Sequence, residues 1–110
     1  MALEIVIKHA KNIPILKLTG RVVDVDVKKF AKKLEAVAKT IAPRIAIDVS
    51  DVNFIDSHGL GILVYHHAAL TKSGRALLIL NTNTDPSTYV NRLFEMTHLN
   101  KVMLVVAELV

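Results

Sequence analysis

The stretch Phe54-Ile55-Asp56-Ser57-His58-Gly59-Leu60-Gly61 joins two different hydrophobic patterns. Residues 44–49 before it form a short apolar run typical of a strand, and the apolar run from Ile62 is typical of a helix. Asp56 and Ser57 therefore lie at a strand-to-helix turn. The first turn of a helix has free N–H groups and a positive dipole end, so a serine there could carry a phosphate. The alternative is that Asp56 or Ser57 is only an N-cap and that the glycines allow close packing.

Strands and helices alternate along the rest of the chain. The expected elements are strands at 3–7 and 13–18, a helix that buries Phe30, Leu34, Val37 and Ile41, a strand at 44–49, a helix at 57–73, a strand at 76–80, a helix that starts at Asp85-Pro86 and buries Val90, Leu93 and Phe94, and a strand at 102–106. The short turn between the first two strands predicts an antiparallel hairpin, and helices between later strands require parallel pairing. We therefore predict an α/β fold with a mixed, mostly parallel sheet, an N-terminal antiparallel hairpin and helices packed against it, in a single domain over residues 1–110.

Composition narrows the class of protein. The chain has 110 residues, 52% of them hydrophobic, which suits one domain with a proper core. It has no cysteine, and no apolar run is long enough to span a bilayer, so we expect a cytoplasmic protein without disulfides or membrane insertion. The net charge is +4, with the densest cluster at Lys28, Lys29, Lys32 and Lys33. The aromatic residue among these lysines, Phe30, belongs to the buried side of the helix and offers no surface for base stacking. We therefore interpret the lysines as a solvated helix face and expect no direct binding of nucleic acid.

Catalytic and metal chemistry are poorly supported by the residue spacing. Asp56, Ser57 and His58 are the residue types of a hydrolase triad, but neighbours on a helix point apart, so His58 is badly placed as a base for Ser57. His66 and His67 are adjacent, whereas a helical metal-binding pair needs a spacing of three or four. We expect His67 to be partly buried with Leu60, Leu63 and Val64, and His66 to be exposed. The chain is thus predicted to be a non-enzyme without metal or cofactor.

The two glycines after Ser57 suggest close contacts around the second helix. Each of Gly59 and Gly61 costs a helix up to about 1 kcal/mol relative to alanine, so tight packing on a strand or close approach of another protein must offset that cost. Ile62, Tyr65 and Ala69 form a second apolar face opposite Leu60, Leu63 and Val64. Apolar residues on both sides predict that one side meets the sheet and that either a partner or neighbouring helices cover the other.

Residues 47–61, Ile47-Asp48-Val49-Ser50-Asp51-Val52-Asn53-Phe54-Ile55-Asp56-Ser57-His58-Gly59-Leu60-Gly61, resemble the signature of the STAS domain family. Leu18-Thr19-Gly20 resembles the Leu-x-Gly that ends a strand in the family, and residues 92–99 resemble the segment before its last strand. These matches follow the order and spacing of the family over nearly the whole chain. Within the family, the likeness is greatest to small, stand-alone anti-sigma factor antagonists of bacteria.

The resemblance implies a phosphorylation-controlled partner switch in transcription regulation. In such proteins the unphosphorylated form binds an anti-sigma factor that is also a serine protein kinase, and the sigma factor is released. Phosphorylation of the serine after the motif aspartate ends binding, and a serine phosphatase restores it. That position is Ser57 here, and a phosphate there would add negative charge close to Asp56 and Asp51. The partner-binding residues expected from the motif and the helix that follows it are Asp56, Ser57, His58, Gly59, Leu60, Gly61, Ile62 and Tyr65.

Two positions depart from the family pattern. His58 follows the serine where a small or hydroxylated residue is usual, and Gly20 is followed by Arg21 where an acidic residue is common, with Asp24 displaced by one position. A divergent partner is implied if this loop takes part in docking. The alternative to the switch is a STAS binding subunit of a signalling or lipid-transport assembly, in which Ser57 is not phosphorylated and serves only as a helix cap.

Overall fold

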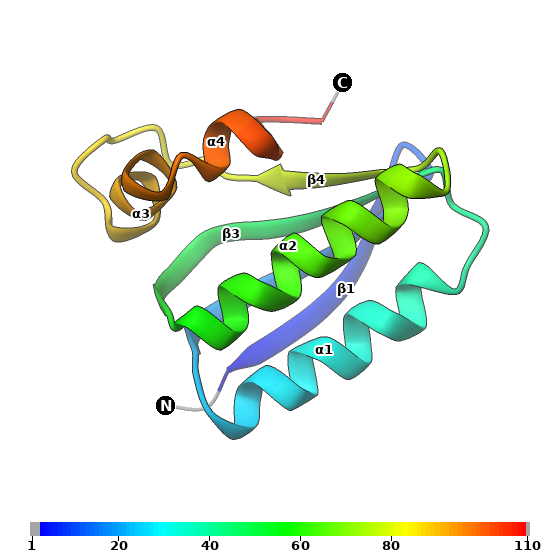
Figure 1. Ribbon diagram of the computed structural model, residues 1–110, viewed down its shortest axis with the longest axis horizontal. Coiled ribbons are helices and arrows are strands. Elements are labelled where there is room, and N and C mark those ends of the chain that lie inside the picture. Colours follow the sequence, from blue (N-terminus) through cyan, green and yellow to red (C-terminus); the bar gives the residue numbers. More distant parts are fainter. Residues whose placement is uncertain (1–2, 110) are drawn as a thin grey trace.

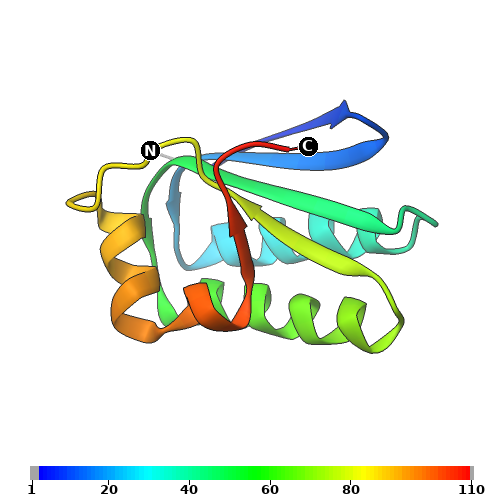
Figure 2. The same ribbon diagram turned by 90° about the horizontal axis from the view of Figure 1, so that it is seen from above.

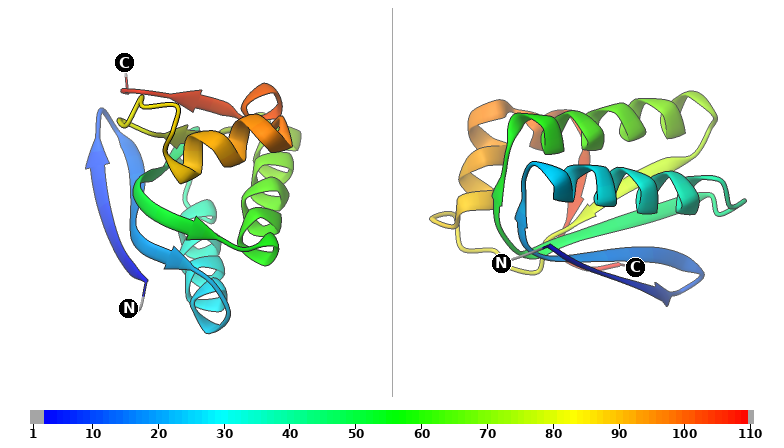
Figure 3. Two further views of the ribbon diagram at one scale, coloured as in Figure 1. Left: turned by 90° about the vertical axis from the view of Figure 1, so that its left-hand side faces the viewer. Right: turned by 90° about the horizontal axis from the view of Figure 1, so that it is seen from below.

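The computed structural model describes residues 3–109 as one sheet with helices on one of its faces (Figure 1). The five strands are β1 (Glu4–Ala10), β2 (Ile13–Val22), β3 (Arg44–Ile55), β4 (Ala76–Leu80) and β5 (Leu104–Val106). The helices are α1 (Val25–Ala38), α2 (Ser57–Lys72), α3 (Tyr89–Thr97) and the short α4 (Leu99–Val102). Figure 3 shows α1 and α2 side by side on the same side of the sheet.

The strand order is β1-β2-β3-β4-β5, with β1 antiparallel to β2 and every later pair parallel. The predicted mixed sheet with an antiparallel hairpin at its start is therefore confirmed. Lys11 and Asn12 connect β1 to β2 with φ angles of 53° and 65°. Positive φ at both turn residues gives the connection the twist that matches two paired strands.

The main core lies between the sheet and the helices. The inward residues of α1 are Val27, Phe30, Leu34 and Val37, as the helical spacing requires. They pack with buried residues of β2, β3 and β4, among them Leu16, Ile47 and Ile79. Because β3 and β4 are covered on this face, their short apolar sequences suit the middle of a parallel sheet.

A smaller cluster covers part of the opposite face of the sheet. Ile13, Ile15, Ala46 and Leu78 are buried there, and Leu109 packs against them. The Lys11 ammonium donates a hydrogen bond to the Leu109 carbonyl at 3.0 Å. Figure 2 shows the segment after β5 returning across this face toward the hairpin of β1 and β2. The chain thus uses its last described residues to cover apolar side chains that the helices do not reach.

The C-terminal third differs from the sequence-based prediction. The third helix starts at Tyr89 with Thr88 as its N-cap, not at Asp85-Pro86. Asp85 instead closes a turn, because its side chain accepts hydrogen bonds from the Ser87 backbone at 2.9 Å and the Ser87 hydroxyl at 2.8 Å. These hydrogen bonds lower the pKa of Asp85, and the bond from the Ser87 backbone contributes most. The predicted strand at 102–106 is shortened to residues 104–106, since Val102 ends α4.

The first helix is shorter than its apolar spacing predicted. It ends at Ala38, so Ile41 lies beyond it and is 98% exposed, not buried. The third strand is longer than predicted and continues to Ile55, because Val52 and Ile55 still point into the core. This extension carries the strand directly to Asp56.

Arg75 holds the connection between α1 and β3 in place. Its guanidinium donates three hydrogen bonds to backbone carbonyls, to Ala38 at 2.7 Å, Thr40 at 2.8 Å and Ala42 at 2.9 Å. The last carbonyls of a helix have no partner within the helix, so a cation placed there satisfies them and favours the negative dipole end. Arg75 thereby fixes where β3 begins.

We expect Arg75→Ala to lower the free energy of unfolding by about 2 kcal/mol, because three charge-assisted bonds are lost from a half-buried site. Arg75→Lys should restore less than half of that loss, since one ammonium group lacks the planar fork of three donors. Urea denaturation of the variants measures both effects. The control is Arg44→Ala at an exposed arginine, expected within about 0.5 kcal/mol of wild type. Equal stabilities for Arg75→Ala and Arg44→Ala would contradict this role.

Candidate functional site

The candidate site is the turn from β3 into α2. Asp56 is the N-cap of α2, and its side chain accepts a hydrogen bond from the Gly59 N–H at 2.8 Å. The first bond of the helix itself runs from the Leu60 N–H to the Asp56 carbonyl at 3.0 Å. Of the two capping candidates in the sequence, Asp56 therefore takes the role, and Ser57 occupies the first helical position. Ser57 is exposed, and it lies at the start of the helix, where the sequence predicted that start.

Asp56 also joins this turn to the loop between β2 and α1. Its backbone N–H donates to the Val22 carbonyl at 3.1 Å, and its second carboxylate oxygen accepts from the Asp24 N–H at 3.4 Å. Asp24 precedes α1 and has a φ of 51°, which is unfavourable for a residue with a side chain. The carboxylate of Asp56 therefore caps one helix and holds the residue that begins the other.

Ser57 and its neighbour His58 point their side chains into solvent. In the described structure, the caps and helix bonds use the N–H groups of Gly59 and Leu60 but not those of Ser57 and His58. Free N–H groups at a positive helix end suit an anion, so a phosphate on Ser57 would be well tolerated. Of the two acidic residues expected near a phosphate on Ser57, Asp56 lies at this turn, where it caps α2. The Asp51 carboxylate pairs instead with Lys17 at 2.9 Å.

The outer face of α2 differs from the predicted one. The buried stripe is Gly59, Leu63, His66 and Leu70, and the residues at the opposite side include Gly61, Val64, Tyr65 and Ala68. Tyr65 is 66% exposed and Val64 is 37% exposed, so Val64 lies outside the stripe to which its spacing assigned it. We call the exposed residues Ser57, Gly61, Val64, Tyr65 and Ala68 the outer face of α2.

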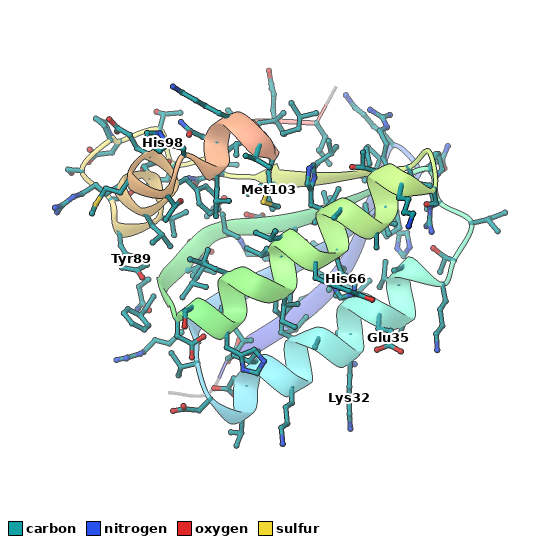
Figure 4. The ribbon with its side chains drawn as sticks, in the orientation of Figure 1. Lys32, Glu35, His66, Tyr89, His98 and Met103 are labelled. Atoms are coloured by element: carbon teal, nitrogen blue, oxygen red, sulfur yellow. The ribbon has the colours of Figure 1, made fainter. Side chains whose placement is uncertain are left out.

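Four expected partner-contact residues of α2 are not part of that outer face: His58 is exposed beside it, Gly59 belongs to the buried stripe, and Leu60 and Ile62 lie between the two faces. Leu60 and Ile62 are both half-buried and pack against the main core. The prediction that Ile62 faces outward is therefore wrong. Its position one turn before His66 puts it on the flank of α2 that faces α1, where Figure 4 shows the His66 side chain.

The histidines of α2 are also placed differently from the prediction. His66 is only 8% exposed, not solvent-facing, and its ring Nδ1 lies 3.0 Å from the Ile62 carbonyl. His67 is half-buried, as predicted, and its Nδ1 has no hydrogen-bond partner in the described structure.

Within residues 3–109 no three acidic or histidine side chains are grouped so that they could hold a metal ion. Over the same residues, no helix combines the length and hydrophobicity needed to cross a membrane.

A column of stacked side chains at the same end of the molecule was not predicted. The Phe54 ring stacks on Tyr89 with centroids 5.3 Å apart, and the Arg21 guanidinium lies 4.9 Å from the Phe54 centroid. The Tyr89 hydroxyl donates to the Ile55 carbonyl at 3.0 Å, which ties α3 to the end of β3. Figure 4 shows Tyr89 at the end of the molecule where β3 turns into α2. Arg21, Phe54 and Tyr89 are far apart in sequence, so no local pattern could have indicated this column.

Comparison with known proteins assigns the chain to a family, because a family model described as the STAS domain matches residues 4–109. The chain belongs to the STAS domain family. A relative from Paenibacillus polymyxa, named anti-sigma F factor antagonist, is 24% identical over 104 residues, which are 94% of this chain and 86% of the relative. The earlier resemblance to this family is confirmed.

Solved structures share the fold of this STAS domain. An anti-sigma factor antagonist from Mycobacterium paratuberculosis has a TM-score of 0.78 at 22% identity, with 98% of this chain and 88% of that chain covered. The Bacillus cell fate determinant SpoIIAA in its phosphorylated form has a TM-score of 0.68 at 18% identity, with 96% of this chain and 93% of that chain covered. At such identities these likenesses concern the fold.

The two glycines of the STAS motif serve different purposes. A Cβ on Gly59 would lie 2.9 Å from both Ile55 Cγ2 and Val22 Cγ1, so only glycine lets α2 approach β2 and β3 this closely. A Cβ on Gly61 would have no atom within 4 Å outside its own helix neighbourhood. Packing inside the domain thus explains Gly59 and leaves Gly61 unexplained. Of the two explanations that the sequence suggested, tight packing on a strand applies to Gly59. Close approach of another protein is the explanation that fits the exposed Gly61.

We expect opposite effects of alanine at these two positions of the STAS domain. Gly59→Ala should lower the free energy of unfolding by about 1–3 kcal/mol, because buried branched side chains must move. Gly61→Ala should raise it by up to about 1 kcal/mol, because alanine favours the helix and meets open space. Chemical denaturation of each variant measures the two changes. A destabilised Gly61→Ala, or an unchanged Gly59→Ala, would contradict the division of roles.

Proposed function

We propose that this STAS protein is an anti-sigma factor antagonist that acts by binding and is switched by phosphorylation of Ser57. The unphosphorylated form binds an anti-sigma factor that is also a serine protein kinase, and the bound sigma factor is released. Phosphorylation of Ser57 ends that binding, and a serine phosphatase reverses it. The proposed place of action is the bacterial cytoplasm, where sigma factors work.

The position of Ser57 carries this proposal. It is an exposed hydroxyl at the first residue of α2, next to a capping carboxylate and at the head of an exposed helix face. The name of the Paenibacillus relative supports the antagonist role, and the phosphorylated SpoIIAA structure has a similar fold. A kinase can reach such a hydroxyl without unfolding any part of the domain.

Phosphorylation would change the surface more than the fold. A phosphate adds about −1.5 to −2 charges, and at a helix N-terminus that charge is favourable to the helix. The same charge is unfavourable for a docked apolar surface, since binding would have to desolvate it next to Asp56. The proposed switch therefore acts by preventing docking on the outer face of α2 while the domain stays folded.

The first test is phosphorylation by the ATP-binding anti-sigma factor kinases encoded in the same genome, each purified and incubated with the chain and Mg-ATP. We expect one phosphate, on Ser57, and none on Ser57→Ala. The control is Ser73→Ala at the other end of α2, which should be phosphorylated like wild type. Ser57→Ala should keep binding the kinase, and Ser57→Asp should bind more weakly, although phosphate should weaken binding further because it has more charge and more acceptor oxygens. Intact-mass spectrometry, peptide mapping and calorimetry provide the measurements.

Several results would refute the switch. If phosphate appears only on Thr71 or Ser73, or if Ser57→Asp binds as tightly as wild type, Ser57 is not the switching residue. A partner complex that persists in the presence of Mg-ATP, with no phosphate ever found on Ser57, would favour the alternative, a constitutive STAS subunit of a signalling or lipid-transport assembly.

The second test concerns the docking face. We expect Tyr65→Asp to weaken kinase binding by about tenfold or more while the stability of the domain changes little, because Tyr65 is 66% exposed and aromatic residues often anchor interfaces. Ile62→Asp is the contrasting variant, which should destabilise the domain itself because Ile62 packs against the core. Calorimetric binding and thermal unfolding are measured for both. Wild-type affinity of Tyr65→Asp would place the docking surface elsewhere.

A further inference from the structure

Arg21 is an exposed cation that the domain has oriented but not neutralised. The ion pairs of residues 3–109 are Lys17 with Asp48 and Asp51, and Lys39 with Glu35, so Arg21 pairs with no carboxylate there. Its guanidinium instead lies over the Phe54 ring at 4.9 Å. A guanidinium stacked on an aromatic face keeps the donors at its edge available for a ligand.

The support beneath Arg21 is itself held in place. Phe54 stacks on Tyr89 at 5.3 Å, and the Tyr89 hydroxyl bonds to the Ile55 carbonyl at 3.0 Å and accepts from the Ile55 N–H at 3.4 Å. An arginine fixed by stacking loses less conformational entropy on binding than one that moves freely. Arg21 therefore has the properties of a preorganised contact.

Arg21 is also continuous with the site at Ser57. It precedes Val22, whose carbonyl accepts the Asp56 N–H at 3.1 Å, and it pairs in the sheet with Phe54, three residues before Ser57. The backbone of Arg21 therefore lies beside the turn at which α2 starts. Asp24, the acidic residue nearest in this loop, forms no ion pair with Arg21 within residues 3–109.

We propose that Arg21 is a specificity-determining contact of this docking surface and that the partner presents a carboxylate to it. A planar guanidinium matches a carboxylate through two parallel hydrogen bonds, and carboxylates are the anionic groups that a protein surface offers. The net charge of +4 on the whole chain also favours association with an acidic partner. This inference rests on the proposed function and specifies the chemistry of its partner.

The test compares charge reversal at two exposed arginines. Arg21→Glu and Arg44→Glu change the net charge equally, but Arg44 begins β3 at the opposite end of the strand from the Ser57 turn. The probe is the anti-sigma factor kinase that binds wild type most tightly. At about 0.05 M NaCl we expect Arg21→Glu to bind at least about tenfold more weakly and Arg44→Glu within about twofold of wild type. At about 0.5 M NaCl the deficit of Arg21→Glu should shrink to about threefold or less, because salt screens exposed charges.

A reciprocal exchange identifies the carboxylate. Acidic residues of the kinase surface are replaced one at a time by lysine, and one such variant should restore the affinity of Arg21→Glu by about tenfold while weakening wild type. Equal losses for Arg21→Glu and Arg44→Glu, no loss for Arg21→Glu, or no rescue by any lysine variant would overturn the inference and leave the switch intact. If no kinase binds wild type at all, the proposed function fails and this inference with it. Circular dichroism and thermal unfolding confirm that each variant is folded.

Discussion

The close packing of the first turn of α2 on the ends of β2 and β3 is the constraint on which the site depends. Gly59 makes it possible, because any side chain there would collide with Val22 and Ile55. Val22 contributes twice, since its side chain meets Gly59 and its carbonyl accepts the Asp56 N–H. The end of β2, the end of β3 and the start of α2 are therefore fixed together, and Asp56 extends the same connection to Asp24 at the start of α1.

The alternation of side chains along a strand turns this buried contact into an exposed surface. Val22 and Ile55 point into the core, so their neighbours Arg21 and Phe54 point the other way and meet across the strand pair. On the helix, Gly59 faces inward, which places Ser57 and Gly61 on the outside. The exposed groups are thus positioned by their buried neighbours, and a protein that docks here meets a rigid surface.

Much of this arrangement could be predicted from local patterns. The apolar runs of β3 and β4, the turn at Asp56 and the start of α2 at Ser57 follow from short-range rules of periodicity and capping. Which side of α2 is buried could not be predicted from local patterns. Helical spacing is compatible with two buried stripes: the predicted one of Leu60, Leu63 and Val64, and the observed one of Gly59, Leu63, His66 and Leu70. A polar side chain is expected outside, yet His66 faces inward. It can do so because its Nδ1 lies within hydrogen-bonding distance of the Ile62 carbonyl of its own helix.

The errors elsewhere in the chain have similar causes. Asp85 has a side chain suited to an N-cap, but that side chain accepts a hydrogen bond from Ser87 and closes a turn. Thr88 caps the helix instead. The contact of Arg21, Phe54 and Tyr89 depends on the register of β2 with β3 and on where α3 lies, which are tertiary facts. Local sequence therefore indicated where the hydroxyl of Ser57 is, and only the fold revealed which charged and aromatic groups lie around it.

The two helices that start at this end of the sheet would let a phosphate at Ser57, as proposed, act as a signal without damaging the domain. α1 and α2 both begin beside the ends of β2 and β3, so their positive dipole ends face the same region of solvent (Figure 1). The Asp56 carboxylate offsets part of that field through its bonds to the Gly59 and Asp24 N–H groups. An added phosphate is favourable to the helix end but adds about −1.5 to −2 charges to the region. A surface that attracts carboxylates through Arg21 would then repel them, so the same local electrostatics that keep the phosphorylated domain folded oppose docking of an acidic partner.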